Sequence, residues 1–316
     1  MEIDVHQHLW PEPLIGLLAR RSEAPRVRRH GDGWYIETPG EPEWKFDPSD
    51  HDPVRRADLV RADGLDLACV ALSSPLGIEA LPPAEAQPLL DAWHEGAAAF
   101  PAGLRAWAAP SLEAPDPVAL GELLDTGFVG MCLPAEALSG AAGMERCGPL
   151  LELLGDRGAP LFVHPGPAPG TPHRAPSSGS SPAGGAPVPC WWPALTRYVA
   201  AMNMAWHAFA AFGPPHPRLR VCFAMLAGLA PLHRERLVAR GGSSAPADMP
   251  EVFFDTSSYG PRAIDAMIRA LGVDSLVYGS DRPVVVPAEP ELGEAVRAAK
   301  LSRNPARLLA LAEVPA

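Results

Sequence analysis

Two histidines near the start of the chain, His6 and His8, are the residues whose type and spacing most directly suggest chemistry. Residues i and i+2 of a β-strand point to the same face, so both imidazoles could face one space. Residues 3–5, just before them, are typical of a short buried strand. Imidazole is a preferred ligand of zinc. The pair predicts part of a metal site, although a His-x-His pair taken alone fits a polar strand end equally well.

Two further segments end in side chains that can bind a metal. The apolar, strand-like run 159–163 is followed by His164, and the run 275–280 is followed by Asp281. Three strand-like segments thus each carry a metal-binding type of residue at the C-terminal end. Three imidazoles and one carboxylate fit a tetrahedral or five-coordinate site with room for a water molecule.

Strand-like and helical patterns alternate along the whole chain. The predicted strands are residues 2–6, 67–72, 104–109, 128–133, 160–164, 219–225, 251–255 and 275–280. The predicted helices are residues 53–64, 84–99, 116–126, 146–158, 193–212, 230–240, 261–272 and 303–312. Strands separated by helices indicate βαβ units and a parallel sheet. Eight such units favour one (β/α)8 TIM-barrel domain over residues 1–316, with its catalytic groups at the C-terminal ends of the strands.

Two segments interrupt this alternation. Residues 22–50 contain two tryptophan-bearing runs around a Pro-Gly pair, which predicts a small β-hairpin inserted after the first strand. Residues 165–192 are rich in Pro, Gly and Ser and predict a long loop after the fifth strand. Both segments leave from the expected catalytic end of the barrel. We expect the first to form a pocket wall and the second to act as a lid, because long loops in compact domains are often functional.

Composition and charge restrict the partners and the compartment. The formal net charge of −11 argues against nucleic acid or an anionic membrane surface as a partner. No apolar run approaches the roughly 18 residues that span a bilayer, and the first predicted strand leaves no room for a signal peptide before it. The five cysteines are scattered and lack metal or disulfide spacing. We therefore expect a cytoplasmic protein that acts on a small molecule.

Taken in order, the motifs resemble the amidohydrolase-related (amidohydrolase 2) family of metal-dependent TIM-barrel hydrolases, and within it the aminocarboxymuconate-semialdehyde decarboxylase group. The resemblance rests on residues 3–8, 162–166, 278–281 and 304–309. It implies one divalent metal ion, with zinc expected first and manganese second, and a possible homodimer. It also implies that Asp281 handles a proton. The implied metal ligands are His6, His8, His164 and Asp281.

The sequence departs from this family at two places. The sixth strand of the family commonly ends in a histidine before a Gly-rich turn, whereas Met225 stands at that position here. A thioether cannot transfer a proton, so any step that relatives assign to this histidine is absent or has moved. The fourth strand, 128–133, also lacks the lysine that bridges two metals in some relatives. This second departure favours a single metal.

Three functions fit these residues. The first is hydrolysis of a small-molecule lactone, ester or amide by metal-activated water, with Asp281 as proton shuttle. The second is non-oxidative decarboxylation of a muconate-like or aromatic acid, in which Asp281 protonates the carbon that loses carbon dioxide. The third is a degenerate barrel that binds a ligand without turnover, for which Met225 is the main support. We rank hydrolysis slightly ahead because the missing histidine harms decarboxylation more.

Several residues at strand ends are candidates for contact with substrate. Trp10, Trp107 and Tyr259 lie at or beyond the ends of the first, third and seventh strands and could line an aromatic pocket. Arg282 could pair with a substrate carboxylate, or could instead form a salt bridge at the rim. Asp255, at the end of the seventh strand, could orient a ligand histidine. The substrate itself does not follow from these patterns.

Overall fold

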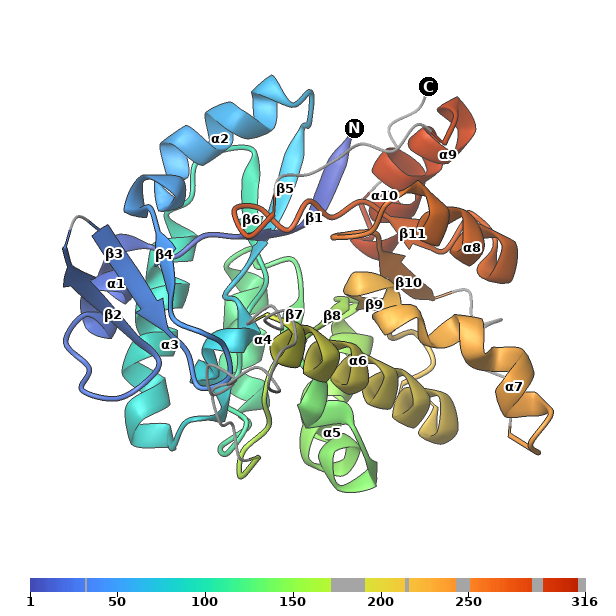
Figure 1. Ribbon diagram of the computed structural model, residues 1–316, viewed down its shortest axis with the longest axis horizontal. Helices are drawn as coiled ribbons and strands as arrows, with labels where there is room; N and C mark the ends of the chain where they lie inside the picture. Colours follow the sequence, from blue (N-terminus) through green and yellow to red (C-terminus); the bar gives the residue numbers. More distant parts are fainter. Residues whose placement is uncertain (32, 172–190, 214–215, 243–250, 286–291, 312–316) are drawn as a thin grey trace, which may run out of the picture.

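Eight parallel strands form the centre of the molecule (Figure 1). The computed structural model describes residues 1–31, 33–171, 191–213, 216–242, 251–285 and 292–311. One parallel sheet has the order β1-β5-β6 and the second has the order β11-β10-β9-β8-β7. The strands are β1 (Ile3–His8), β5 (Leu67–Ala71), β6 (Leu104–Ala106), β7 (Met131–Pro134), β8 (Leu161–His164), β9 (Val221–Phe223), β10 (Val252–Asp255) and β11 (Leu276–Val277).

Backbone hydrogen bonds join the two sheets at both edges and close the barrel. Between β6 and β7, the Ala108 N–H donates to Gly130 O at 2.8 Å, and the Cys132 N–H donates to Ala108 O at 2.8 Å. Between β1 and β11, the Val5 N–H donates to Tyr278 O at 2.9 Å. The predicted (β/α)8 barrel is therefore confirmed, and its C-terminal rim brings distant segments of the chain together.

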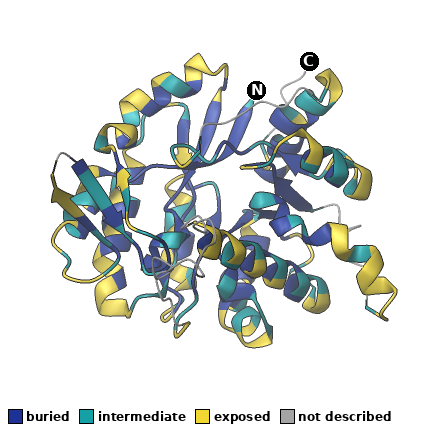
Figure 2. Ribbon diagram, viewed as in Figure 1, coloured by how far each residue is buried: buried dark blue, intermediate teal, exposed yellow. Residues whose placement is uncertain are grey.

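Helices surround this barrel, and their inner faces are buried while their outer faces are exposed (Figure 2). Two of them begin alike: Asp52 and Asp116 each accept two backbone N–H groups, and a proline follows in the first turn. The helices are α2 (Pro53–Ala62), α3 (Pro83–Ala98), α4 (Pro117–Asp125), α5 (Ala141–Arg157), α6 (Trp192–Phe212), α7 (Arg234–Val238), α8 (Pro261–Leu271), α9 (Glu294–Ala298) and α10 (Asn304–Leu308). Among the described helices, none is long and apolar enough to cross a membrane.

The segment inserted after β1 is larger than the predicted hairpin. It holds helix α1 (Glu12–Leu18) and an antiparallel sheet of three strands, β2 (Arg26–His30), β3 (Gly33–Glu37) and β4 (Trp44–Phe46). This sheet lies to one side of the barrel (Figure 1). The strands β3 and β4 form a hairpin that coincides with the two tryptophan-bearing runs. The extra strand β2 is largely polar, and it is held by backbone pairing with β3 rather than by an apolar pattern.

The predicted loop 165–192 is described only in part, because residues 172–190 lie outside the described residues. Its lid role stays a prediction. The chain is described again from Trp191, and Trp192 begins α6.

The chain takes an unusual path where β9 ends. Residues 225–229 all have positive φ, between 47° and 63°, which is a left-handed turn. Such backbone costs a residue with a side chain roughly 1–2 kcal/mol. Asn203 of α6 donates from Nδ2 to Gly228 O at 2.8 Å and to Val199 O at 2.9 Å, and so ties this turn to the helix. The predicted helix 230–240 is present only as a 3₁₀ segment that ends at His233, followed by α7.

Candidate metal centre

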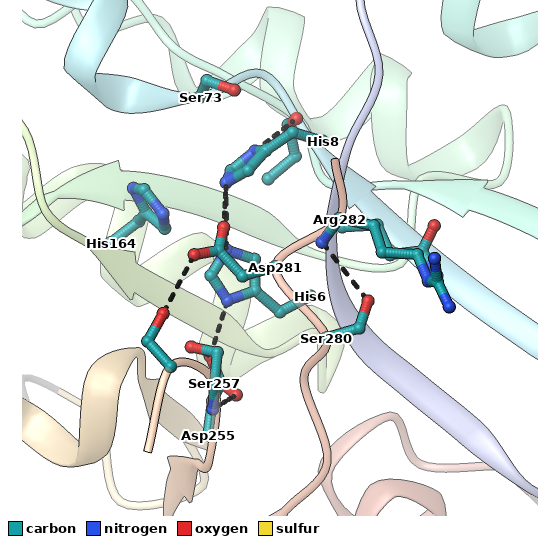
Figure 3. Close-up of polar contacts among 12 residues, drawn as sticks. His6, His8, Ser73, His164, Asp255, Ser257, Ser280, Asp281 and Arg282 are labelled. Carbon is teal, nitrogen blue, oxygen red and sulfur yellow. Dashed lines mark hydrogen bonds and ion pairs between the residues drawn. The ribbon is translucent and has the colours of Figure 1, made fainter. Parts of the chain in front are cut away.

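Four side chains that can bind a metal meet at the C-terminal rim of the barrel. His6 and His8 lie on β1, His164 ends β8, and Asp281 follows β11. One donor atom from each lies within 4.8 Å of the others. The three histidines are buried, and the side chain of Asp281 is 13% exposed. Figure 3 shows the Asp281 carboxylate next to His6 and His8, with His164 facing the same space. The four residues singled out in the sequence thus come together.

The distances within the cluster are short. His6 Nε2 lies 3.0 Å from His8 Nε2, and Asp281 Oδ1 lies 3.5 Å from His6 Nε2 and 3.2 Å from His8 Nε2. The imidazole centroid of His164 lies 4.9 Å from those of both other histidines. Donor atoms this close to one another can bind a single cation at the usual distances between metal and ligand.

Each imidazole is oriented by an acceptor on its other nitrogen. The Nδ1 atom lies 2.6 Å from Asp255 Oδ2 in His6, 3.1 Å from Ala71 O in His8, and 2.9 Å from Pro165 O in His164. These acceptors place the ring hydrogen on Nδ1 and leave the Nε2 lone pair facing the cluster. Two lone pairs at 3.0 Å repel, so a proton or a metal cation must lie between them. Three imidazole nitrogens and one carboxylate therefore fit a divalent ion.

Asp255 belongs to the site because it orients the imidazole of His6. Its Oδ1 accepts the Ser257 N–H at 2.7 Å, and its Oδ2 accepts the Ser257 hydroxyl at 2.7 Å. The carboxylate is fully buried at the end of β10. The geometry matches the prediction that Asp255 orients a ligand histidine.

Three of the four groups have pKa values shifted toward the forms that bind cations. Burial would raise the pKa of Asp281, but its contacts with His6, His8 and His164 lower it to about 2. Burial lowers the pKa of His8, and it lowers that of His164 well below its ordinary value. His6 is the exception: burial opposes its charged form, but Asp255, Asp281 and Asp4 together outweigh burial and raise the His6 pKa. A neutral imidazole and an ionised carboxylate are the states that ligate a metal.

A buried network beneath the site holds β1 to the segment that carries Asp281. Asp4 Oδ1 accepts the His6 N–H at 3.0 Å and the Ser280 N–H at 3.1 Å. Its other oxygen accepts from the side chain of Gln7 at 2.8 Å. Arg56 of α2 then donates to the Gln7 side chain at 3.1 Å and to His8 O at 2.9 Å. This network keeps the two histidines of β1 in register with Asp281.

Three residues of this cluster, His8, His164 and Asp281, line a cavity of about 570 Å³. Its wall comes from the barrel rim, from the inserted sheet and from the start of α6, which supports the prediction of a pocket wall at 22–50. Met225 lines this cavity, so the position expected to hold a histidine presents a thioether to a ligand. Residues lining it include His8, Trp10, Trp44, Ser73, His164, Leu195, Met225, Asp281 and Val285.

Of the four residues predicted to contact substrate, the structure brings Trp10 to this cavity. The Trp107 side chain points into the barrel interior, where it is fully buried, donates to Val5 O at 3.0 Å and stacks on Phe162. Tyr259 packs against the core and does not line the cavity. For these two residues, a position near a strand end does not decide on which side of the strand the ring lies.

Arg282 takes the second of its two predicted roles. Its guanidinium donates from Nη2 to Asp63 Oδ2 at 2.7 Å, and Figure 3 draws the side chain pointing away from the three histidines. A salt bridge at the rim therefore replaces the predicted contact with a substrate carboxylate.

Two polar residues of the cavity wall were missed in the sequence. Glu41 follows β3 in the inserted sheet, and Tyr198 lies on α6. Both line the cavity, and the Tyr198 hydroxyl donates to Glu41 Oε1. Neither belongs to a motif or ends a predicted strand, so no sequence signal marks them.

No protein-family model matches the sequence, and no curated protein matches it. Solved structures do match over nearly the whole chain. IDCase from Metarhizium anisopliae has a TM-score of 0.69 at 18% identity and covers 99% of this chain and 98% of its own. An amidohydrolase II structure has a TM-score of 0.70 at 20% identity and covers 98% and 100%.

A third structure is 5-carboxyvanillate decarboxylase from Novosphingobium aromaticivorans, complexed with manganese and 4-hydroxy-3-methoxy-5-nitrobenzoic acid. It has a TM-score of 0.63 at 14% identity and covers 98% of this chain and 96% of its own. At these identities the likeness establishes the fold. The chain has the barrel fold of these amidohydrolase and decarboxylase structures over nearly its full length.

Proposed function

We propose that this chain is a metal-dependent hydrolase that acts on a small-molecule lactone, ester or amide. One divalent ion, zinc first and manganese second, would be held by His6, His8, His164 and Asp281. The observation that carries the proposal is the convergence of these four donors, within 4.8 Å of one another, at the wall of a cavity large enough for a small molecule.

The chain's own residues divide the work of this reaction. When bound, the ion would supply Lewis acidity and lower the pKa of a coordinated water to about 7. Oδ1 of Asp281 faces His6 and His8, while its Oδ2 accepts the Ser258 hydroxyl at 3.3 Å. Oδ2 is therefore the atom placed to accept a proton from the attacking water and return it to the leaving group.

Met225 explains why we assign proton transfer to Asp281. The end of β9 presents a thioether to the cavity, and a thioether neither donates nor accepts a catalytic proton. The residues of the cluster that line the cavity are His8, His164 and Asp281, and Asp281 is the carboxylate among them. Hydrolysis needs only one such group, since the same carboxylate serves in both halves of the reaction.

The proposal is tested by metal analysis combined with a substrate panel. Purified wild type should hold one equivalent of a divalent ion and should hydrolyse at least one lactone, ester or amide only in the metal-loaded form. His164→Ala should lose both properties. His207→Ala is the matched control, because His207 lies on α6 and does not line the cavity. A stoichiometric ion without turnover on the panel would favour the binding barrel, and wild type that binds no ion would refute the proposal.

Decarboxylation of an aromatic or muconate-like acid is the second candidate. It is supported by the structural likeness to a 5-carboxyvanillate decarboxylase that holds manganese and a benzoic acid derivative. The same Asp281 would then protonate the carbon that loses carbon dioxide. Release of carbon dioxide from a panel of hydroxybenzoic acids, without hydrolysis of esters or lactones, would decide for this candidate.

The predictions about binding partner, cellular location and oligomeric state belong with this proposal. A cavity of about 570 Å³ suits a small-molecule substrate, and the net charge of −11 disfavours nucleic acid. Four cysteines of the described chain are free and buried, which suits the predicted cytoplasmic location: Cys69, Cys132, Cys147 and Cys222. The location, like the homodimer, stays a prediction.

A further inference from the structure

The cavity has a second polar patch that the metal chemistry does not use. Thr38, Glu41 and Tyr198 line the same cavity as His8, His164 and Asp281. Glu41 is not part of the ligand cluster at the rim. Much of the lining around these polar groups is apolar, including Trp10, Leu76, Leu195, Met225 and Val285. A ligand that reaches the ion from this cavity therefore also meets a carboxyl group.

Glu41 is held in one orientation and keeps hydrogen-bonding capacity. The Tyr198 hydroxyl donates to Oε1, and the Thr38 hydroxyl reaches Oε2 at 3.4 Å, near the outer limit of a hydrogen bond. Glu41 is only 8% exposed. Burial raises the pKa of its carboxyl, while the hydrogen bond from Tyr198 and the positive charge of Arg197 act in the opposite direction and favour the carboxylate. A carboxylate oxygen accepts more than one hydrogen bond, so Oε2 can still accept a donor from a ligand.

Two cations, Arg197 and Lys45, lie near this polar patch. The guanidinium of Arg197 packs where a Cβ of Gly40 would stand and lies over the Tyr198 ring at 5.1 Å. Arg197 lines a smaller hollow with Gly40, not this cavity. Lys45 does line the cavity, but its Cε and Nζ lie against Gly33 of β3. The arginine predicted to receive a carboxylate, Arg282, is bound to Asp63.

We infer that Glu41, positioned by Tyr198, is a specificity-determining residue that selects substrates with a hydroxyl or amine at the end remote from the reacting group. A second carboxylate at that end would face Glu41 in a partly dry cavity and would be rejected. The inference rests on the proposed metal-dependent function. It narrows the substrate class to molecules with an apolar middle and a hydrogen-bond donor at the far end.

Alkyl hydroxamic acids of several chain lengths test this inference on metal-loaded protein. The hydroxamate group binds the ion, and the far end carries a methyl, hydroxyl, amine or carboxylate group. Dissociation constants are measured by titration calorimetry, so no turnover is needed. At the best chain length, wild type should bind the amine about tenfold more tightly than the methyl compound, and the carboxylate about tenfold more weakly.

Glu41→Gln should reduce both differences to about twofold or less, because the amide keeps the shape and removes the charge. Glu43→Gln is the matched control, since Glu43 lies two residues away, pairs with His30 and does not line the cavity. It should retain both tenfold differences. If Glu41→Gln fails to fold, Tyr198→Phe replaces it, and the preference for the amine should fall about threefold because Glu41 loses its orienting partner.

The failures are distinguishable. If the methyl compound does not bind metal-loaded wild type, the metal site is wrong and the inference falls with it. If the methyl compound binds, but the four far ends bind equally or the carboxylate binds best, the metal site stands and only the role of Glu41 is overturned.

Discussion

Asp281 and Glu79 are both buried carboxylic acids near the C-terminal rim, and their surroundings shift their pKa values in opposite directions. Three histidines lower the pKa of Asp281 to about 2 against the effect of burial. Glu79, in the 3₁₀ segment Ile78–Ala80 after β5, is fully buried, and its pKa rises to about 7. The comparison teaches that partners, and not depth, decide which acid is ready to hold a cation.

The two acids also differ in how their oxygens are used. Oδ1 of Asp281 faces two imidazoles and its Oδ2 accepts from Ser258. Oε1 of Glu79 accepts from Ser74 at 2.8 Å, whereas Oε2 has no partner among the described residues. Asp281 is therefore ionised near neutral pH, whereas Glu79 has a pKa close to neutrality.

The largest effect is expected from Asp281→Asn. The amide removes the one anionic ligand, so affinity for zinc or manganese should fall on the order of 1,000-fold, beyond the roughly 10–100-fold that outer partners cost. Competition with a chelator measures this affinity. Asp265→Asn is the control, because Asp265 lies on the surface of α8 and pairs with Arg269. Unchanged affinity in Asp281→Asn would remove Asp281 from the ligand set.

Glu79→Gln should change how the stability of the protein depends on pH. The folded-state pKa of about 7 lies above the ordinary value of 4.5, so the unfolded chain loses this proton first. Below pH 4.5 Glu79 does not lower the free energy of unfolding of wild type. As the pH rises toward 7, this free energy falls by up to about 3 kcal/mol.

The glutamine variant lacks this loss. Its free energy of unfolding, measured in urea, should approach or pass that of wild type between pH 5 and pH 8. Ser74 can still donate to the amide oxygen. Parallel pH curves for the two proteins would contradict the raised pKa of Glu79.

Asp255→Asn should weaken the metal site without removing a ligand. Asp255 accepts the ring hydrogen of His6 at 2.6 Å, and loss of such a partner typically lowers metal affinity about 10–100-fold. The measurement is again chelator competition. Ser257→Ala, which removes one hydrogen bond to Asp255 and none to the histidine, should have a smaller effect. Equal effects of the two variants would mean that Asp255 does not act through His6.

The smallest effect concerns the turn that carries Met225 at the rim. Asn203→Ala leaves backbone carbonyls of the turn and of α6 without their side-chain donor. We expect the free energy of unfolding to fall by about 1 kcal/mol. Met204→Ala, at an exposed position of the same helix, should change it by less than about 0.5 kcal/mol. Equal losses in both variants would mean that Asn203 does not stabilise the left-handed turn.

The barrel and the convergence of His6, His8, His164 and Asp281 could be predicted because local patterns encode them. Short apolar runs such as 159–163, set between helical patterns, are typical of buried strands, and the residue after such a run falls at the rim. Asp255 could be placed near a histidine for the same reason. The ordering of strands along the chain then brings these ends together without further information.

Side-chain direction and long-range contacts could not be predicted in this way. Trp107 and Trp10 both lie at strand ends, but one ring fills the barrel and the other lines the cavity. Arg282 binds Asp63, and Glu41 meets Tyr198, across distances in sequence that no local pattern spans. These contacts depend on how the inserted sheet and the helices settle against the rim.

The seam between β1 and β11 gives the cluster a consequence for the folding of the whole chain. The Asp281 N–H donates to His6 O at 2.9 Å. His6 lies on β1 and Asp281 follows β11, and these are the first and last strands of the barrel, whose pairing closes it. An ion shared by them would act as a removable cross-link between the two ends of the sequence. Removal of the ion should let the backbone amides of β1 and β11 exchange their hydrogens well before those of the other barrel strands.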